Sequence, residues 1–228
     1  MTRFTSLALL ALSFALTAGA AQAQSITTTF TSDNGGGVGG IVYFDVLVDD
    51  NELEITEIDF NTDTTNTVDL EVYFKTDTYV GSEGNASAWT LHETVTGLTG
   101  AGTDNATNAV LGTPLTLSAS TQYAMALVIE GGGHEYTEGT GSNEEYSNGD
   151  LLLEMGAAEN VPFDGSPFEP RVWNGTLHYT GGESGGGGGG GGGDDGDCST
   201  GTGNSNWLAL LGLLSVVAIA ARVRGAKS

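Results

Sequence analysis

The stretch Val68–Lys75, with the sequence VDLEVYFK, decides the fold class. Apolar residues stand at every second position, with mostly polar residues between them. The apolar set is Val68, Leu70, Val72 and Phe74, and the polar set is Asp69, Glu71 and Lys75. Because successive side chains of a β-strand point to opposite faces, this alternation predicts a strand that buries one face and exposes the other.

Similar short runs recur from residue 26 to residue 179, and no long stretch shows helical periodicity. They are Ile26–Thr31, Ile41–Val48, Leu53–Asn61, Trp89–Thr96, Leu115–Leu117, Tyr123–Ile129, Leu151–Met155 and Val172–Tyr179. Turn sequences rich in Gly, Asn and Asp separate them, such as DNGGGVGG at 33–40. Eight or nine short strands with such connections predict an all-β fold, a single antiparallel β-sandwich or jelly-roll domain over residues 24–180.

Two local features add detail to this prediction. Within Leu53–Asn61 the apolar phase shifts between Ile55 and Ile58, and one extra residue there indicates a β-bulge. The pair Asn174-Gly175 has two interpretations that the sequence leaves open. It forms a type I′ hairpin turn, or Gly175 marks a bulge in a terminal strand.

The N-terminus has the three parts of a secretory signal peptide. Arg3 supplies a positive charge, Leu7–Leu16 is a short apolar run, and Ala21-Gln22-Ala23 fits an A-x-A cleavage site. The run is shorter than the ~20 residues that span a bilayer. We therefore expect residues 1–23 to be removed and the mature protein to begin near Gln24, outside the cytoplasm.

The C-terminal segment differs in composition from the rest of the chain. Residues 181–206 are rich in Gly and Asp, which predicts a flexible linker. Residues 207–221 are apolar or small and predict a hydrophobic sorting or transmembrane helix that contacts the membrane. Residues 222–228 contain Arg222, Arg224 and Lys227 and predict a basic cytoplasmic tail.

This tail resembles bacterial C-terminal sorting signals of the MYXO-CTERM and GlyGly-CTERM types. The matching parts are Gly185–Gly193, the GDCSTGTG segment, Trp207–Ala221, and Arg222 with Arg224. The resemblance implies that a sorting protease removes the helix and that Cys198 serves in processing or lipid attachment. The chain has no second cysteine and no unbroken arginine run, so the subtype of the signal stays open.

Two stretches of the domain are also familiar: VYFKTDTYVGSEGNASAWTL at 72–91 and NVPFDGSPFEPRVWNGTLHYT at 160–180. They resemble a β-rich, largely uncharacterised module of exported bacterial proteins. The resemblance implies export and a β fold, and it implies no activity.

Charge excludes one class of partner. All 29 acidic residues lie between Asp33 and Asp197, where Lys75 and Arg171 are the only basic residues. Such a surface repels phosphate backbones, so we expect no nucleic-acid partner. The simplest interpretation is solubility in a salty medium, where self-repulsion is screened.

Motifs for catalysis are missing. Gly35–Gly40 fits G-x-G-x-x-G, but it precedes a strand instead of joining a strand to a helix, so we interpret it as a turn. The sequence contains no G-x-S-x-G, Walker or HExxH motif. We therefore expect no cofactor and no enzymatic activity. A carboxylate pair suited to glycoside hydrolysis cannot be chosen from so many acidic residues.

Two sets of residues are candidates for binding. The loop at 131–150 contains the only His/carboxylate cluster, His134-Glu135-x-x-Glu138. Such an oxygen-rich loop can hold Ca²⁺, and the candidate ligands are Glu135, Glu138, Glu144, Glu145 and Asp150. Its spacing is not that of an EF-hand, and a solvated acidic loop is the favoured interpretation. Trp89 and Trp173 are candidate platforms for sugar stacking, although core positions are favoured for both.

Together these observations predict an exported, surface-anchored, non-enzymatic protein that is structural, adhesive or glycan-binding, located at the cell surface, at the outer membrane or outside the cell. Its partners would be an extracellular glycan or matrix. The alternative is a surface hydrolase that acts on polysaccharide through a carboxylate pair. A solvent-open cleft with two facing carboxylates would favour the hydrolase, and a flat sheet face that bears exposed aromatic rings would favour binding.

Overall fold

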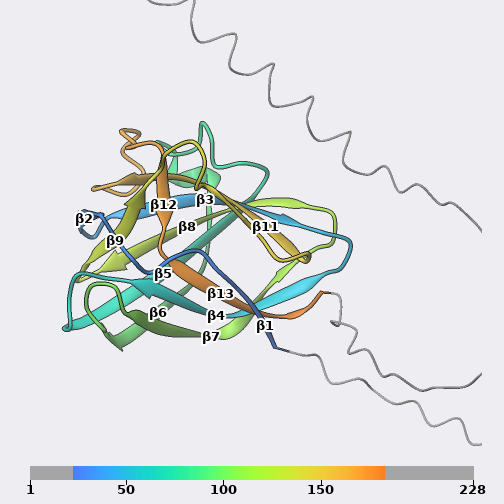
Figure 1. Cartoon of the computed structure of the whole chain (residues 1–228), viewed down its shortest axis with the longest axis horizontal. Coiled ribbons are helices and arrows are strands. Elements are labelled where there is room, and N and C mark those ends of the chain that lie inside the picture. Colours follow the sequence, from blue (N-terminus) through green and yellow to red (C-terminus); the bar gives the residue numbers. More distant parts are fainter. Residues whose placement is uncertain (1–22, 183–228) are drawn as a thin grey trace, which may run out of the picture. The chain divides into compact units, whose positions relative to one another are not determined.

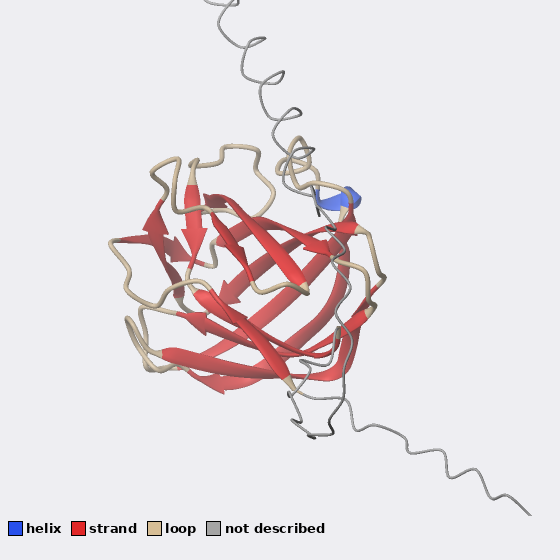
Figure 2. Ribbon diagram, turned by 45° about the vertical axis from the view of Figure 1, so that its right-hand side comes forward, coloured by secondary structure: helices blue, strands red, loops and turns tan. Residues whose placement is uncertain are grey.

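The computed structural model describes residues 23–182, and all of them belong to one unit of the chain. Apart from one turn of 3-10 helix, η1 (Ala86–Ala88), the regular structure is β-strand (Figures 1 and 2). The predicted signal peptide, Cys198, the apolar helix, the basic tail and nearly all of the linker lie outside the described residues. Among residues 23–182 no helix has the length and hydropathy that crossing a membrane requires.

The strands form three sheets, and every pair within them is antiparallel. The four-stranded sheet has the order β1 (Gln24–Thr27), β13 (Gly175–Gly181), β4 (Leu53–Asn61) and β7 (Ala106–Leu117). The six-stranded sheet has the order β10 (Glu145–Ser147), β11 (Leu151–Glu159), β3 (Ile41–Val48), β8 (Gln122–Glu130), β5 (Thr67–Thr76) and β6 (Thr90–Thr99). The three-stranded sheet has the order β12 (Arg171–Trp173), β9 (Gly133–Glu138) and β2 (Asn34–Val38). The prediction of an antiparallel all-β fold is confirmed.

One apolar cluster joins the four-stranded and six-stranded sheets, and we call it the inter-sheet core. It includes Ile55 and Ile58 of β4 on one side and Phe44 of β3 on the other, all fully buried. The Phe44 and Trp173 rings stack inside it, with centroids 4.8 Å apart and planes 5° apart. Burial of this kind is the main favourable contribution to folding.

The stretch that decides the fold class is β5, and it behaves as its alternation predicts. Val68, Leu70 and Val72 are buried in the inter-sheet core. The strand pairs with β8 on one side and β6 on the other. Strand β3 differs, because nearly all its residues are buried, whichever face they occupy. Its outer face is covered as well as its inner face, which explains why the run IVYFDVLV is apolar at every position except Asp45.

The bulge predicted in β4 is present. The register of β4 shifts between Ile55 and Glu57 against β7, and a matching shift occurs between His178 and Tyr179 on β13. The extra residue lets Ile55 and Ile58 both point into the inter-sheet core.

Two segments predicted as a turn or a loop contain strands. The DNGGGVGG turn includes β2, and the acidic loop at 131–150 includes β9 and β10. Strand β7 also runs for 12 residues where only Leu115–Leu117 was expected. Backbone pairing with distant strands builds these segments, and glycine-rich or mixed sequences carry no side-chain alternation that would reveal it.

Asn174 and Gly175 form neither a hairpin turn nor a bulge. The chain leaves the three-stranded sheet at Trp173 and enters the four-stranded sheet at Gly175. A Cβ atom at Gly175 would overlap the Trp173 ring, so this crossing needs glycine for space.

Candidate functional site

The outer face of the six-stranded sheet carries three rows of side chains that run across the strands. The strand registers align Ala157, Tyr43, Ala126 and Tyr73 in the middle row. They align Glu159, Ile41, Val128 and Glu71 on one side of it. On the other side they align Glu154, Asp45, Ala124 and Lys75. An aromatic and alanine row is thus flanked by carboxylates on both sides.

Two loops cover the middle row with further aromatic rings. Tyr79 and Trp89 come from the loop between β5 and β6, and Phe163 comes from the segment 160–170 between β11 and β12. The Tyr43 centroid lies 5.6 Å from that of Trp89 and 6.2 Å from those of Tyr79 and Phe163. Tyr73 meets Phe163 edge to face at 5.3 Å. We call these five rings, with the sheet residues beneath them, the outer aromatic cluster.

A buried hydrogen-bond centre lies at the edge of this cluster. The Tyr43 hydroxyl donates to Glu159 Oε2 at 2.9 Å and accepts from the backbone N–H of Phe163 at 3.2 Å. Glu159 is 2% exposed, and its Oε1 has no hydrogen-bond partner within the described part of the chain. Burial raises the pKa of the Glu159 carboxyl, while the Tyr43 hydroxyl opposes the rise.

Asp45 and Glu154 are a facing carboxylate pair on adjacent strands. Burial raises the pKa of both carboxyls, and the charge of Asp45 adds to the effect at Glu154. Both carboxylate oxygens of Asp45 nonetheless accept a hydrogen bond, one from Tyr79 N at 2.9 Å and the other from Gln122 Nε2 at 3.1 Å. Its main role in this structure is to hold the Tyr79 loop on the sheet.

The outer face of the four-stranded sheet carries an organised polar network. Asp59 accepts from His178 Nε2 at 2.7 Å and from Asn108 Nδ2 at 2.8 Å. Asn108 also donates to Glu57 Oε2 at 3.0 Å. The hydroxyls of Thr27 and Thr176 are hydrogen-bonded at 2.9 Å in the same register row as Asp59 and Asn108. We call this set the polar sheet face.

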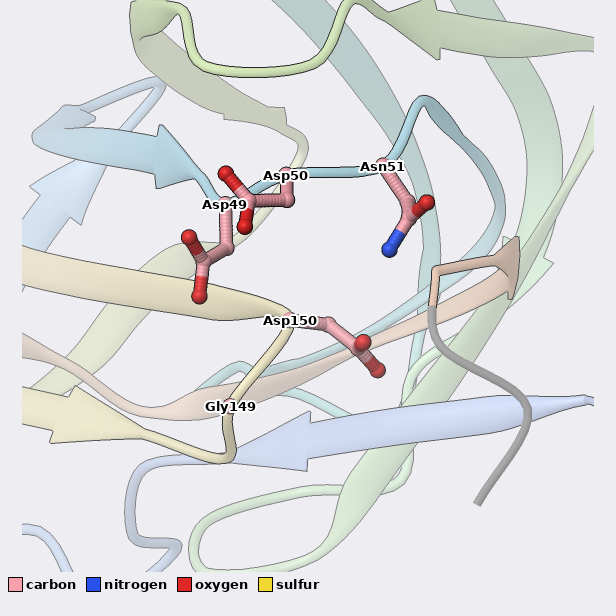
Figure 3. A pocket seen from close by; sticks show the side chains of 5 residues that line it. All are labelled: Asp49, Asp50, Asn51, Gly149 and Asp150. Atoms are coloured by element: carbon pink, nitrogen blue, oxygen red, sulfur yellow. The ribbon is translucent and has the colours of Figure 1, made fainter. Parts of the chain in front are cut away.

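An acidic pocket lies where β3 ends and β11 begins (Figure 3). It is lined by Asp49, Asp50, Asn51, Gly149 and Asp150 and has a volume of about 100 Å³. Asp150 accepts from the buried Tyr179 hydroxyl at 2.9 Å. The pocket has room for water or a single ion, and it is smaller than the pockets of ~300 Å³ and above that hold organic ligands.

The five acidic residues suggested for Ca²⁺ are not brought together. Glu135 accepts from Ser32, Glu138 from Asn34, and Glu144 from the backbone of Gly141. Glu145 faces Glu154 across β10 and β11, and Asp150 lies in the acidic pocket. Within residues 23–182 no group of three His, Cys, Asp or Glu side chains is placed to hold a metal.

The two candidate tryptophans are both in apolar clusters. Trp173 is 2% exposed in the inter-sheet core, and Trp89 is 7% exposed in the outer aromatic cluster. Sequence reasoning did not select Tyr43, Glu159 or Asp45. One signal was available for Asp45, because it is the single charge within the apolar run IVYFDVLV.

The sequence belongs to no family that a comparison with known proteins identifies. No protein-family model matches the sequence, and no curated protein matches it. Among solved structures, part of the chain is similar to part of the clostridial cysteine protease Cwp84 after propeptide cleavage, with a TM-score of 0.45 and 13% sequence identity. The match covers 69% of this chain and 40% of that one, so the chain spans less than half the length of the protease.

Proposed function

We propose that this chain is an exported, surface-anchored, non-enzymatic protein whose β-sandwich domain binds extracellular glycan or matrix. The polar sheet face is the observation that carries the proposal. Its hydroxyl, carboxylate, amide and imidazole groups are the donors and acceptors that sugar hydroxyls need. The hydrogen bonds of Asp59 and Asn108 hold these groups in place before a ligand arrives.

The negative charge of the domain limits the kind of glycan that it can bind. The described residues contain 25 acidic side chains and two basic ones, Lys75 and Arg171. Lys75 donates to the backbone of Thr78, and Arg171 lies over the rings of Tyr136 and Phe168. An anionic polymer would meet repulsion from this surface, which favours a neutral glycan.

Anchoring completes the proposal. The signal peptide at 1–23 brings the domain out of the cytoplasm, and the C-terminal helix holds it at the membrane until a sorting protease acts near Cys198. The support for this step is the resemblance of the tail to known sorting signals. The linker then separates the domain from the membrane, which suits contact with a matrix.

The second candidate is a surface hydrolase that uses Asp45 and Glu154. Their facing positions and raised pKa values favour it. It ranks second because Asp45 is 5% exposed and both its oxygens accept hydrogen bonds. If the full chain releases reducing ends from a polysaccharide and Glu154→Gln abolishes the release, the hydrolase replaces the binding protein.

Two experiments test the proposal. Intact-mass analysis of the mature protein should show loss of residues 1–23 and a C-terminus near Cys198, and retention of Trp207–Ala221 would contradict sorting. A glycan array with the full chain, with and without Ca²⁺, should show binding to neutral glycans. Asn108→Ala should weaken that binding, whereas the matched variant Asn105→Ala, on the adjacent loop, should leave it unchanged. Silence under both conditions would contradict glycan binding.

A further inference from the structure

We propose that the outer aromatic cluster is a second binding site, a trough for one neutral sugar residue, and that Phe163 occupies it in the closed state. The inference rests on the proposed glycan-binding function in its choice of ligand. It concerns a different surface from the polar sheet face, so each can fail without the other.

The trough has the chemistry of a sugar site. With Phe163 displaced, Tyr43, Tyr73 and Trp89 would offer aromatic surface on which the C–H face of a pyranose can stack. Glu159 and Glu71, in the neighbouring row, offer carboxylate acceptors for hydroxyls. Mostly apolar walls with a few fixed polar groups are typical of small-ligand sites.

Glu159 provides the most specific indication of a missing partner. Its Oε1 is buried and makes no hydrogen bond of good geometry with the residues described, whereas buried polar atoms are nearly always paired. The other oxygen already accepts from Tyr43. The backbone N–H groups of Asp164 and Gly165, which stabilise the carboxylate in the closed state, belong to the same segment as Phe163 and would leave with it. A sugar hydroxyl in the trough would donate to Oε1, and the Glu159 and Glu83 carboxylates beside Tyr43 would disfavour an acidic sugar.

Phe163 closes the trough in a strained conformation. Its ring contacts the rings of Tyr73, Tyr43 and Trp89, with centroids at 5.3, 6.2 and 6.2 Å. Its backbone has φ of 60°, a left-handed conformation that is rare for a bulky residue and unfavourable by about 1–2 kcal/mol. The cluster holds this strain, so displacement of the ring would relieve it.

The segment 160–170 is attached mainly by hydrogen bonds at its ends and at the Glu159 carboxylate. Asn160 accepts from Gly37 N–H, Phe168 exchanges two backbone hydrogen bonds with Ala158, and Phe163 N–H donates to Tyr43. The backbone N–H groups of Asp164 and Gly165 stabilise the Glu159 carboxylate. Val161 is 57% exposed, and the Ser166 N–H bonds within its own turn to Asp164. Segments with few buried contacts open at low free-energy cost, so a closed segment can exchange with an open one.

The test removes the ring and keeps the backbone. Phe163→Gly deletes the side chain at a φ that glycine adopts without strain. The matched control is Val161→Gly, an exposed position in the same segment. The probes are neutral gluco-, manno-, galacto- and chito-oligosaccharides of about three to six units, titrated by calorimetry against the full chain.

We expect Phe163→Gly to bind one class of these sugars at least about tenfold more tightly than wild type, because apparent affinity rises as the closed fraction disappears. Val161→Gly should match wild type, and Glu159→Gln added to Phe163→Gly should reverse the gain. If a folded Phe163→Gly protein binds every probe no better than Val161→Gly, the trough is not a binding site.

If Phe163→Gly does not fold, a second variant, Tyr43→Phe, tests the same proposal. Tyr43→Phe keeps all five rings and removes the hydroxyl that holds both Phe163 N–H and Glu159. It should speed hydrogen exchange of residues 160–168 and raise sugar affinity, and an unchanged affinity with faster exchange would overturn the proposal. Binding that is lost with Asn108→Ala but unaffected by these variants would support the polar sheet face and exclude the trough.

Discussion

The inter-sheet core and the outer aromatic cluster bury apolar side chains on opposite faces of the same six-stranded sheet. Strands build the first, with Phe44, Leu70 and Leu127 pointing inward at alternate positions. Loops complete the second, because Trp89 and Phe163 come from irregular segments and lie over Tyr43. The inter-sheet core is therefore fixed by the strand order of the fold. The outer aromatic cluster is added by loops, whose sequences can differ without changing that strand order.

Both clusters contain a buried polar atom without a hydrogen-bond partner among the described residues, and in the inter-sheet core this atom is Trp173 Nε1. Inside the outer cluster the Tyr43 hydroxyl and Glu159 lie among aromatic rings, and one carboxylate oxygen stays unpaired among the described residues. Such an arrangement destabilises the fold, whereas purely apolar contacts stabilise it. Natural proteins retain unfavourable groups mainly where they serve a function. A buried carboxylate oxygen is more costly than a buried indole N–H, so of these two clusters the outer one is the better place to look for a ligand.

The largest expected effect is in the inter-sheet core. Phe44→Ala removes a fully buried ring stacked on Trp173 and should lower the free energy of unfolding by about 3–5 kcal/mol. Denaturant titration followed by circular dichroism measures it. Phe163→Ala, in the outer cluster, should lower the same free energy by less than half as much. Equal losses would show that the two clusters form one cooperative core.

The second-largest expected effect is the loss of stability when His134 becomes protonated at low pH. Burial lowers the pKa of His134 from 6.5 to about 4. The unfolded chain therefore binds a proton in a pH range where the folded chain does not. Stability from neutral His134 is complete above pH 6.5 and falls by about 3 kcal/mol as pH decreases to 4.

Comparison with a variant isolates this contribution, because the raised pKa values of Asp45, Glu154 and Glu159 act in the opposite direction. The unfolding free energy of wild type should drop more steeply than that of His134→Gln between pH 7 and pH 4. The half-exposed His92→Gln serves as control and should follow wild type. Parallel curves for wild type and H134Q would mean that His134 is hydrated in solution.

A smaller effect is expected at Tyr43. Tyr43→Phe leaves Phe163 N–H and Glu159 Oε2 without their shared partner, which should lower the free energy of unfolding by about 1–3 kcal/mol. The loss should be local to the outer cluster. Hydrogen exchange should speed up in residues 160–168 and stay slow in β3 and β8. Faster exchange throughout the six-stranded sheet would contradict a separate outer cluster.

The sequence predicts the strands that form the inter-sheet core better than it predicts the other elements. The alternation in Val68–Lys75 and the phase shift near Ile55 predict a strand and a bulge, because burial of one face by a partner sheet imposes a period on the sequence. Residues 34–38 and 133–138 could not be recognised as strands, because backbone bonds to distant residues define them.

The candidate sites were still harder to predict. Tyr43, Trp89, Glu159 and Phe163 come together through strand register and loop conformation, and neither leaves a motif in the sequence. Asp59, Asn108 and His178 likewise lie on three strands that are far apart along the chain. Their residue types are common in any acidic β protein, so only the fold distinguishes them.

The smallest effect on stability is expected at the sheet edges, where the inter-sheet core ends. Glu93 of the edge strand β6 accepts from Gly112 N at 3.0 Å and Thr113 N at 3.3 Å of the edge strand β7. Its carboxylate thus caps backbone groups that another chain could pair with. Because Glu93→Ala removes these hydrogen bonds, it should lower the free energy of unfolding by about 0.5–1 kcal/mol.

Self-association should respond more than stability does. Sedimentation velocity of Glu93→Ala should detect a concentration-dependent dimer that is absent from wild type. The reason is that the freed N–H groups of β7 can donate hydrogen bonds to an edge strand of a second chain. Glu130→Ala removes the same charge from the end of the central strand β8 and should stay like wild type. If both variants associate, the general acidic charge keeps the chains apart. If only Glu93→Ala does, capping of this edge is the cause, and the two sheets are closed at their margin by side chains as well as by the apolar core between them.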